Sequence, residues 1–380
     1  MSVKAFPAIE GFRAIFNLWI VALHQQMFQR CFLAIYDKMP LLEKLTETTW
    51  AGISMGLGYQ VDVFFALSGF LFTWGLIQPG KTKSLYEHVA SLVLFVVKRV
   101  LRMWPVIIVV LAIAFAVKDA WATDVFELVM QLTIPHYRDN QPQASVPGWS
   151  NRVDIESCIL LFVVVSTLKH FNLLNRFTSI LLIPVSLIPK ASRFLSDPDA
   201  FSYMRLGADV FTTAVHIPIK TQEYYRDVLF PNTNHTFTSI APAERMTPLF
   251  YGEYSVTHQR WSPLFVGSAV AVCLYYAYQQ AKEPRKEKSS AFQTVLNVLS
   301  RLFSFVLLLV SIVLALMPVL MSLSPADADV RANVLSNPPL EADFVLSVLG
   351  RTLNACGWGY ILYRCLLPVG HPLRLNLLSS

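Results

Sequence analysis

Long apolar runs recur along the whole chain and are separated by shorter polar segments. Each run is about 20 residues long, the length a helix needs to cross the hydrocarbon core of a bilayer. The predicted spans are residues 13–35, 60–78, 95–117, 154–170, 174–190, 262–280, 296–322 and 345–367. The fifth contains Pro184 and Pro189, which interrupt helices. The pattern therefore predicts an all-α fold, a polytopic transmembrane helix bundle of about eight spans.

The charges of the connecting segments predict an orientation. The segments after the second and sixth spans are net positive, whereas those after the first, third and seventh are net negative. Because Lys and Arg accumulate in cytoplasmic loops, both termini are expected in the cytoplasm. Residues 191–261 are expected to form a long loop on the outer side. In it Asn234 starts an Asn-His-Thr glycosylation sequence, which fits a lumenal or extracellular position but is equally well read as an unused sequon.

Composition supports the same class. The chain is 54% hydrophobic and 15% charged, with a mean hydropathy of +0.47. These values exclude an ordinary soluble enzyme and indicate an integral, multi-pass membrane protein, with the choice between endomembrane and plasma membrane left open. The net charge of +6 is attributed to cytoplasmic loops rather than to a nucleic-acid partner. The five cysteines are scattered and suggest neither a disulfide framework nor a metal site. We expect residues 1–380 to form a single membrane domain.

Polar residues inside the first predicted span form one stripe. His24 lies eleven positions after Arg13, which at 100° per residue returns to nearly the same helix face, about 16 Å further along the axis. Asn17 falls on that stripe. Polar groups within a bilayer are costly and usually face the protein interior, so these are site candidates. Taken singly, Arg13 also fits a positive-inside anchor and His24 a structural histidine.

The second and third spans add further candidates. Asp62 lies near the outer end of the second, either at the interface or within the hydrocarbon, while Ser68 and Gly69 lie in its middle and suit helix packing. In the third, Arg99 and Arg102 are three residues apart and share a face. Such a pair suits phosphate groups or, equally, the lipid headgroups.

The outer ends of the fourth and sixth spans are also polar. Trp149 and Ser150 precede Asp154 and Glu156 at the start of the fourth span, and Glu156 stands before an apolar run where it needs a partner. Arg260 directly precedes the sixth span. It is expected either to form part of the rim of a pocket or to anchor the helix at the membrane interface, and the anchor is slightly favoured.

Four motifs resemble the acyltransferase-3 family of membrane acyltransferases, whose eukaryotic branch includes the nose-resistant-to-fluoxetine-like proteins. They are "EGFRAIFNLWIVALH" with its Arg-x10-His spacing, "VDVFFALSGFLF", "RVLR" and "WSNRVDIE", and the resemblance covers roughly residues 8–375. It implies that His24 is catalytic, that Arg13 is its motif partner, and that Arg99 and Arg102 contact coenzyme A phosphates. Acyl-CoA would be a cosubstrate, with no permanently bound cofactor and no metal.

Two departures from the family pattern are visible. Members usually carry ten or more spans, so this chain is expected to be C-terminally incomplete. The aromatic residue that usually follows the position of Glu156 is replaced by Ser157, which bears on acceptor recognition.

The resulting hypothesis is an integral membrane O-acyltransferase that moves an acyl group, acetyl in the first instance, from cytoplasmic acyl-CoA to a hydroxyl of a lipid or carbohydrate. His24 would be the general base, and Asp154 or Glu156 would orient it or bind the acceptor. The alternatives are a non-catalytic membrane transporter or lipid-handling protein on the same fold, since intramembrane charges also mark transport pathways, and an inactive truncated product.

Overall fold

The structure is a computed structural model. It describes residues 6–35, 60–78, 149–196, 260–282, 291–322, 344–369 and 371–375, together with short pieces between residues 86 and 109. The helices are α1 (Pro7–Ile35), α4 (Gln60–Ile77), α7 (Trp149–His170), α8 (Arg176–Ser186), α9 (Ile188–Ser196), α13 (Trp261–Lys282), α14 (Ala291–Ser322), the π-helical η7 (Val345–Leu349) and α17 (Gly350–Leu366). The described residues contain no strand, which confirms the all-α class.

Four described segments are long and apolar enough to cross a membrane. They are Gln60–Ile77, Arg176–Ser196, Trp261–Lys282 and Val298–Leu316, and they coincide with the second, fifth, sixth and seventh predicted spans. The predicted spans at 13–35, 154–170 and 345–367 also fall on helices, namely α1, α7 and η7 with α17. The third, 95–117, lies almost wholly outside the described residues. The number of spans and the side of each terminus remain predictions.

The two prolines of the fifth predicted span do not end the helical segment. Pro184 lies inside α8, and Pro189 lies in the first turn of α9, where the missing N–H costs no helical hydrogen bond. The segment therefore breaks at Leu187 and continues as a second helix to Ser196. The expected loop boundary at residue 191 was wrong, because the chain is still helical there.

A tight turn joins α7 to α8. Asn172 adopts a positive φ of 56°, a conformation that asparagine tolerates better than most residues. The Asn175 side chain then accepts from the Thr178 backbone N–H, and the Thr178 hydroxyl accepts from the Asn175 N–H, forming a capping box. These two residues reverse the chain, so that α8 returns beside α13, where Arg176 donates to Gln280.

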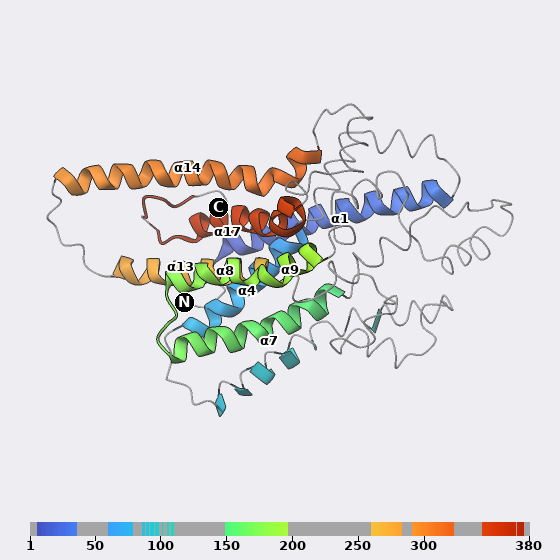
Figure 1. Cartoon of the computed structure of the whole chain (residues 1–380), viewed down its shortest axis with the longest axis horizontal. Coiled ribbons are helices and arrows are strands. Elements are labelled where there is room, and N and C mark those ends of the chain that lie inside the picture. The colour runs from blue at the N-terminus through green and yellow to red at the C-terminus, as the bar shows by residue number, and fades with distance from the viewer. Residues whose placement is uncertain are drawn as a thin grey trace.

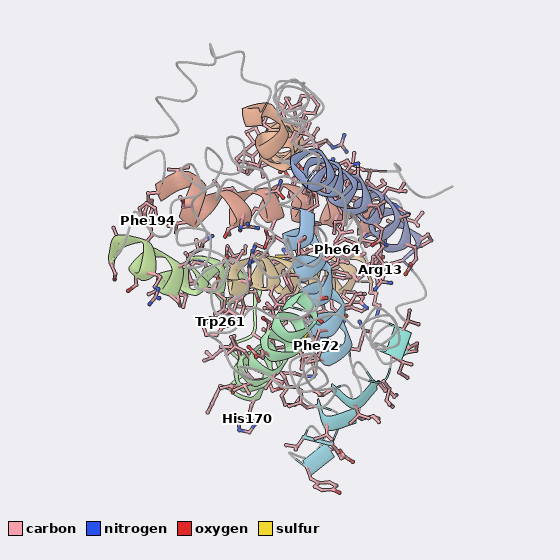
Figure 2. All side chains as sticks on the ribbon, turned by 90° about the vertical axis from the view of Figure 1, so that its right-hand side faces the viewer. Arg13, Phe64, Phe72, His170, Phe194 and Trp261 are labelled. Atoms are coloured by element: carbon pink, nitrogen blue, oxygen red, sulfur yellow. The ribbon has the colours of Figure 1, made fainter. Side chains whose placement is uncertain are left out.

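Side-chain and backbone contacts set the relative directions of α1, α4 and α13. Phe6 contacts Trp74, whereas Phe16 contacts Phe64, so α1 and α4 are antiparallel. Contacts between Gly69 and Leu264 and between Thr73 and Ser268 make α4 and α13 parallel. In Figures 1 and 2, α14 lies at one side of the bundle and α7 at the other, with α17, α13 and α4 between them.

Glycines set the closest helix contacts. A Cβ on Gly69 would lie 2.1 Å from the Leu264 carbonyl oxygen, and one on Gly267 would lie 1.7 Å from the Ala66 carbonyl oxygen. Only a hydrogen fits at these points, so the backbones of α4 and α13 touch. The packing role predicted for Gly69 is thereby confirmed. Beside it, Thr73 donates a 2.9 Å hydrogen bond to Ser268 across the same interface.

Candidate functional site

A pocket of about 480 Å³ lies between α1 and α4. Its lining consists of Glu10, Arg13, Ala14, Asn17, Phe64, Leu67, Ser68 and Leu71. The α1 wall is mainly polar, whereas α4 contributes three apolar side chains and one hydroxyl. The structure thus brings together Arg13, Asn17 and Ser68, three residues singled out in the sequence. Figure 2 shows Arg13 and Phe64, from the two walls, on the same side of the bundle.

The first helix presents this polar wall because an adjacent stripe, roughly 100° around the helix, is aromatic and buried. Phe12 and Phe16 are buried, and their rings meet the indole of Trp358 on α17 edge to face, with centroids 6.0 and 5.0 Å apart. Burying these rings against α17 fixes the rotation of α1 about its axis. Arg13 and Asn17 are then directed to the pocket between α1 and α4.

Arg13 is paired at the mouth of this pocket. Its Nη1 donates to Oε1 of Glu10, one turn earlier, at 2.7 Å, and the two side chains are 31% and 71% exposed. An ion pair this exposed contributes little to stability. Its importance is instead that Glu10, which the sequence analysis did not single out, holds the guanidinium at the pocket. The spacing of three residues between Glu10 and Arg13, which places them on one helix face, was the sequence feature that could have indicated this pair.

A second polar centre lies near the N-terminal end of α4. Asp62 is fully buried and accepts from two arginines: Arg260 Nη1 lies 2.7 Å from its Oδ1, and Arg351 Nη1 lies 2.5 Å from its Oδ2. Arg260 and Arg351 are only 1% and 4% exposed. The carboxylate therefore joins three helices that are far apart in the sequence.

This arrangement corrects the interpretation of Arg260. An interface anchor would keep its guanidinium in contact with headgroups or water, whereas Arg260 is almost wholly enclosed. The Asp62 carboxylate makes that burial possible because it offsets the charge. The same observation shows that Asp62 is buried inside the protein, and its depth in the membrane stays a prediction.

Arg351, like Glu10, is a residue that sequence reasoning missed. It lies two residues after the end of the π-helical turn η7, a rare local structure that is frequent at functional sites. A signal was present, because Arg351 is a charged residue inside the predicted span 345–367 and such residues rarely face lipid. Its partner could not be inferred from spacing along the chain.

Asp154 and Glu156 lie on a different helix from the pocket. Both are in α7, where Asp154 is 7% exposed and Glu156 is half-buried. Val153 packs with Phe65 of α4, which places this end of α7 beside α4. In both figures α4 lies between α7 and α1, and neither acid belongs to the pocket lining.

The remaining predicted site residues are placed only in part. His24 lies in α1, about 16 Å beyond Arg13 by helical rise, but its side chain is outside the described part. Trp149 and Ser150 are the first two residues of α7, again without described side chains. Arg99, Arg102 and Asn234 fall outside the described residues. Within the described ranges, no group of three His, Cys, Asp or Glu side chains could hold a metal ion.

Comparison with known proteins fits these features. A model of the acyltransferase-3 family, described as an acyltransferase domain, matches residues 6–207, which is more than half of the chain and includes α1, α4 and α7 to α9. No curated protein and no solved structure matches significantly. The family match and the apolar helices agree with the motifs around Arg13, Asp62 and Asp154. The chain is an integral membrane acyltransferase and belongs to the acyltransferase-3 family.

Proposed function

We propose that the protein transfers an acyl group, acetyl in the first instance, from cytoplasmic acyl-CoA to a hydroxyl of a lipid or carbohydrate acceptor. We further propose that the donor binds in the pocket between α1 and α4. The observation that carries this proposal is the convergence of Arg13, Asn17 and Ser68 on that pocket. Arg13 and Asn17 lie on α1, the helix that also bears His24.

The pocket offers two kinds of contact that an acyl thioester needs. On the α1 wall, the Arg13 guanidinium can bind a phosphate, and the Asn17 amide can bond to the amides of the pantetheine arm. On the α4 wall, Phe64, Leu67 and Leu71 offer an apolar surface for methylene groups and the acyl chain. Arg99 and Arg102 are proposed as further phosphate contacts, on the basis of their motif alone.

His24 is proposed as the general base. A donor bound beside Arg13 and extended along α1 would direct its thioester toward His24. The imidazole then takes the proton of the acceptor hydroxyl, whose oxygen attacks the thioester carbonyl. The new C–O ester bond forms, the C–S bond breaks, and the coenzyme A thiolate leaves and is protonated from the imidazolium. The histidine returns to its neutral form.

The acidic residues of α7 are proposed to act on the acceptor. Asp154 and Glu156 belong to α7, and α4 lies between α7 and α1 (Figure 1). Contact with acceptor hydroxyls therefore fits this helix better than orientation of the His24 imidazole. Carboxylates accept hydrogen bonds from sugar or glycerol hydroxyls. In the predicted orientation, this end of α7 is on the outer side of the membrane.

The proposal is tested with the full chain in native membranes supplied with radiolabelled acetyl-CoA. Label transferred to lipid and glycan fractions is measured for wild type, His24→Ala and the neighbouring Gln25→Ala. We expect His24→Ala to lose transfer by about 10²- to 10⁴-fold, the usual contribution of a general base, while Gln25→Ala stays near wild type. Equal transfer by wild type and His24→Ala at equal membrane abundance would remove His24 from the mechanism.

A further inference from the structure

The chain turns back on itself after α17. The Leu375 backbone N–H donates to the Arg364 carbonyl oxygen at 3.0 Å. The Arg364 side chain is buried, and it donates through Nε to the Leu373 carbonyl oxygen and through Nη1 to Ser304 on α14. Both chain neighbours of Arg374 are therefore bonded to one buried arginine, which fixes the backbone of this return.

Arg374 is held in place without a partner for its charge. Its backbone N–H donates to the His371 carbonyl oxygen at 3.0 Å. Its side chain is half-buried, and Nε is enclosed and has no hydrogen-bond partner in the described part of the chain. Nor does the guanidinium form an ion pair with any described residue. A cation that is already immobilised loses less entropy when it binds an anion.

The position of Arg374 is at the end of the bundle where α1 begins. Arg374 lies within electrostatic range of the Tyr278 hydroxyl on α13. The Tyr278 ring packs on Trp74, with centroids 6.0 Å apart, and Trp74 packs on Phe6, at 5.3 Å. Phe6 directly precedes α1. Arg13, at the donor pocket, is seven positions further, about 10 Å along the helix axis.

The order of groups in coenzyme A matches this arrangement. The thioester ends the pantetheine arm, the pyrophosphate follows, and the adenosine 3′-phosphate lies at the far end of the molecule. With the pyrophosphate at Arg13 and the thioester extended toward His24, the 3′-phosphate extends toward the start of α1. This is the end of the bundle where Arg374 lies.

We propose that Arg374 binds the 3′-phosphate of the coenzyme A donor and that Arg364 is its positioning residue. The inference rests on the proposed function, because it assumes a donor in the pocket between α1 and α4. A guanidinium matches the geometry of a phosphate group and binds it through charge-assisted hydrogen bonds. Arg374 lies outside residues 6–207, which the acyltransferase-3 model matches.

The test compares two ligands that differ only in this phosphate. The full chain is placed in nanodiscs of neutral phosphatidylcholine, which contain no anionic headgroup. Titration calorimetry then measures the Kd of coenzyme A and of dephospho-coenzyme A, which lacks the 3′-phosphate. Neither ligand carries an acyl group, so binding is measured without transfer. The variants are Arg374→Gln, Arg374→Lys and the control Arg301→Gln, which removes an exposed charge from α14.

We expect wild type and Arg301→Gln to bind coenzyme A about 5- to 10-fold more tightly than dephospho-coenzyme A. Arg374→Gln should lose affinity for coenzyme A alone and bind the two ligands about equally. Arg374→Lys should keep part of the preference, because it keeps the charge.

Three results would overturn the proposal while leaving the donor pocket in place. They are equal affinity of wild type for the two ligands, an unchanged preference in Arg374→Gln, and an equal loss of affinity for both ligands in that variant, which would indicate a structural role. If wild type binds neither ligand, the proposed donor pocket is overturned as well.

Discussion

Asp62 and Arg351 are ion-paired at 2.5 Å although 289 positions separate them in the chain. The pair fixes the beginning of α4 against the beginning of α17, and Arg260 joins α13 to the same carboxylate. On its other side α4 forms a wall of the proposed donor pocket. The position of the pocket wall is therefore linked to a buried electrostatic contact at the end of the same helix.

Neutralising Asp62 should destabilise the protein strongly. Asp62→Asn leaves Arg260 and Arg351 buried without their carboxylate, and loss of one partner in a buried ion pair typically costs about 3–5 kcal/mol. Glu10→Gln removes an acid from an exposed pair and should cost only about 0–1 kcal/mol. Thermal unfolding in one detergent compares the two variants. Similar Tm values for both would show that the buried contact does not stabilise the fold.

The glycine contacts predict that Ala is destabilising at Gly267 on α13 but tolerated at Gly75 on α4. Gly267→Ala places a Cβ 1.7 Å from the Ala66 carbonyl oxygen and must separate α13 from α4. Overpacking of this kind costs about 1–3 kcal/mol. Gly75→Ala meets nothing within 4 Å and should be neutral or stabilising by up to about 1 kcal/mol through helix propensity. The free energy of unfolding is measured for both variants. An equal decrease in stability at both positions would count against backbone contact at Gly267.

The Glu10–Arg13 pair predicts opposite effects on donor affinity. Arg13→Gln removes a phosphate-binding charge and should raise the KM for acetyl-CoA by roughly tenfold, with a smaller effect on kcat. Glu10→Gln frees the Arg13 guanidinium from its ion pair. It also removes a negative charge that would repel a bound phosphate, so the KM should fall by a few fold. Steady-state kinetics at varied acetyl-CoA measures both. A rise in KM for Glu10→Gln would contradict phosphate binding at this end of the pocket.

Phe64 is expected to limit the length of the acyl chain. Its ring lines the donor pocket and contacts Phe16 behind it, with centroids 6.2 Å apart. Phe64→Ala should open space and raise the relative kcat/KM for butyryl-CoA over acetyl-CoA by roughly tenfold, the scale of one or two methylene groups in an apolar pocket. Phe72→Ala is the control, because Phe72 packs against Phe162 of α7 instead. Unchanged chain-length preference in both variants would place the acyl group elsewhere.

The helices of this protein could be predicted because a bilayer imposes a simple rule on sequence. Apolar length located α4, α13 and α14 within a few residues. The rule was less informative at the fifth span, where Pro184 and Pro189 suggested an early end but the chain formed two successive helices. A proline near a helix start differs little in sequence from one that ends a helix, and tertiary packing decides between them.

The site was predictable only where its residues share an element. Arg13 and Asn17 lie four positions apart, so helical periodicity placed them on one face. By contrast, the pairing of Asp62 with Arg260 and Arg351 depends on how three helices meet, and no local pattern records that. Charged residues inside predicted spans are a useful search criterion, and applied to every span it also selects Arg351.

The central claim is that the pocket between α1 and α4 binds the acyl donor, and cysteine protection tests it most directly. Ser68→Cys, inside the pocket, and Gly75→Cys, exposed on the same helix, are labelled with a membrane-permeant maleimide, and mass spectrometry resolves the labelling rate at each position. We predict that acetyl-CoA slows labelling at residue 68 several-fold and leaves the rate at residue 75 unchanged. Equal labelling of residue 68 with and without saturating acetyl-CoA would contradict the claim.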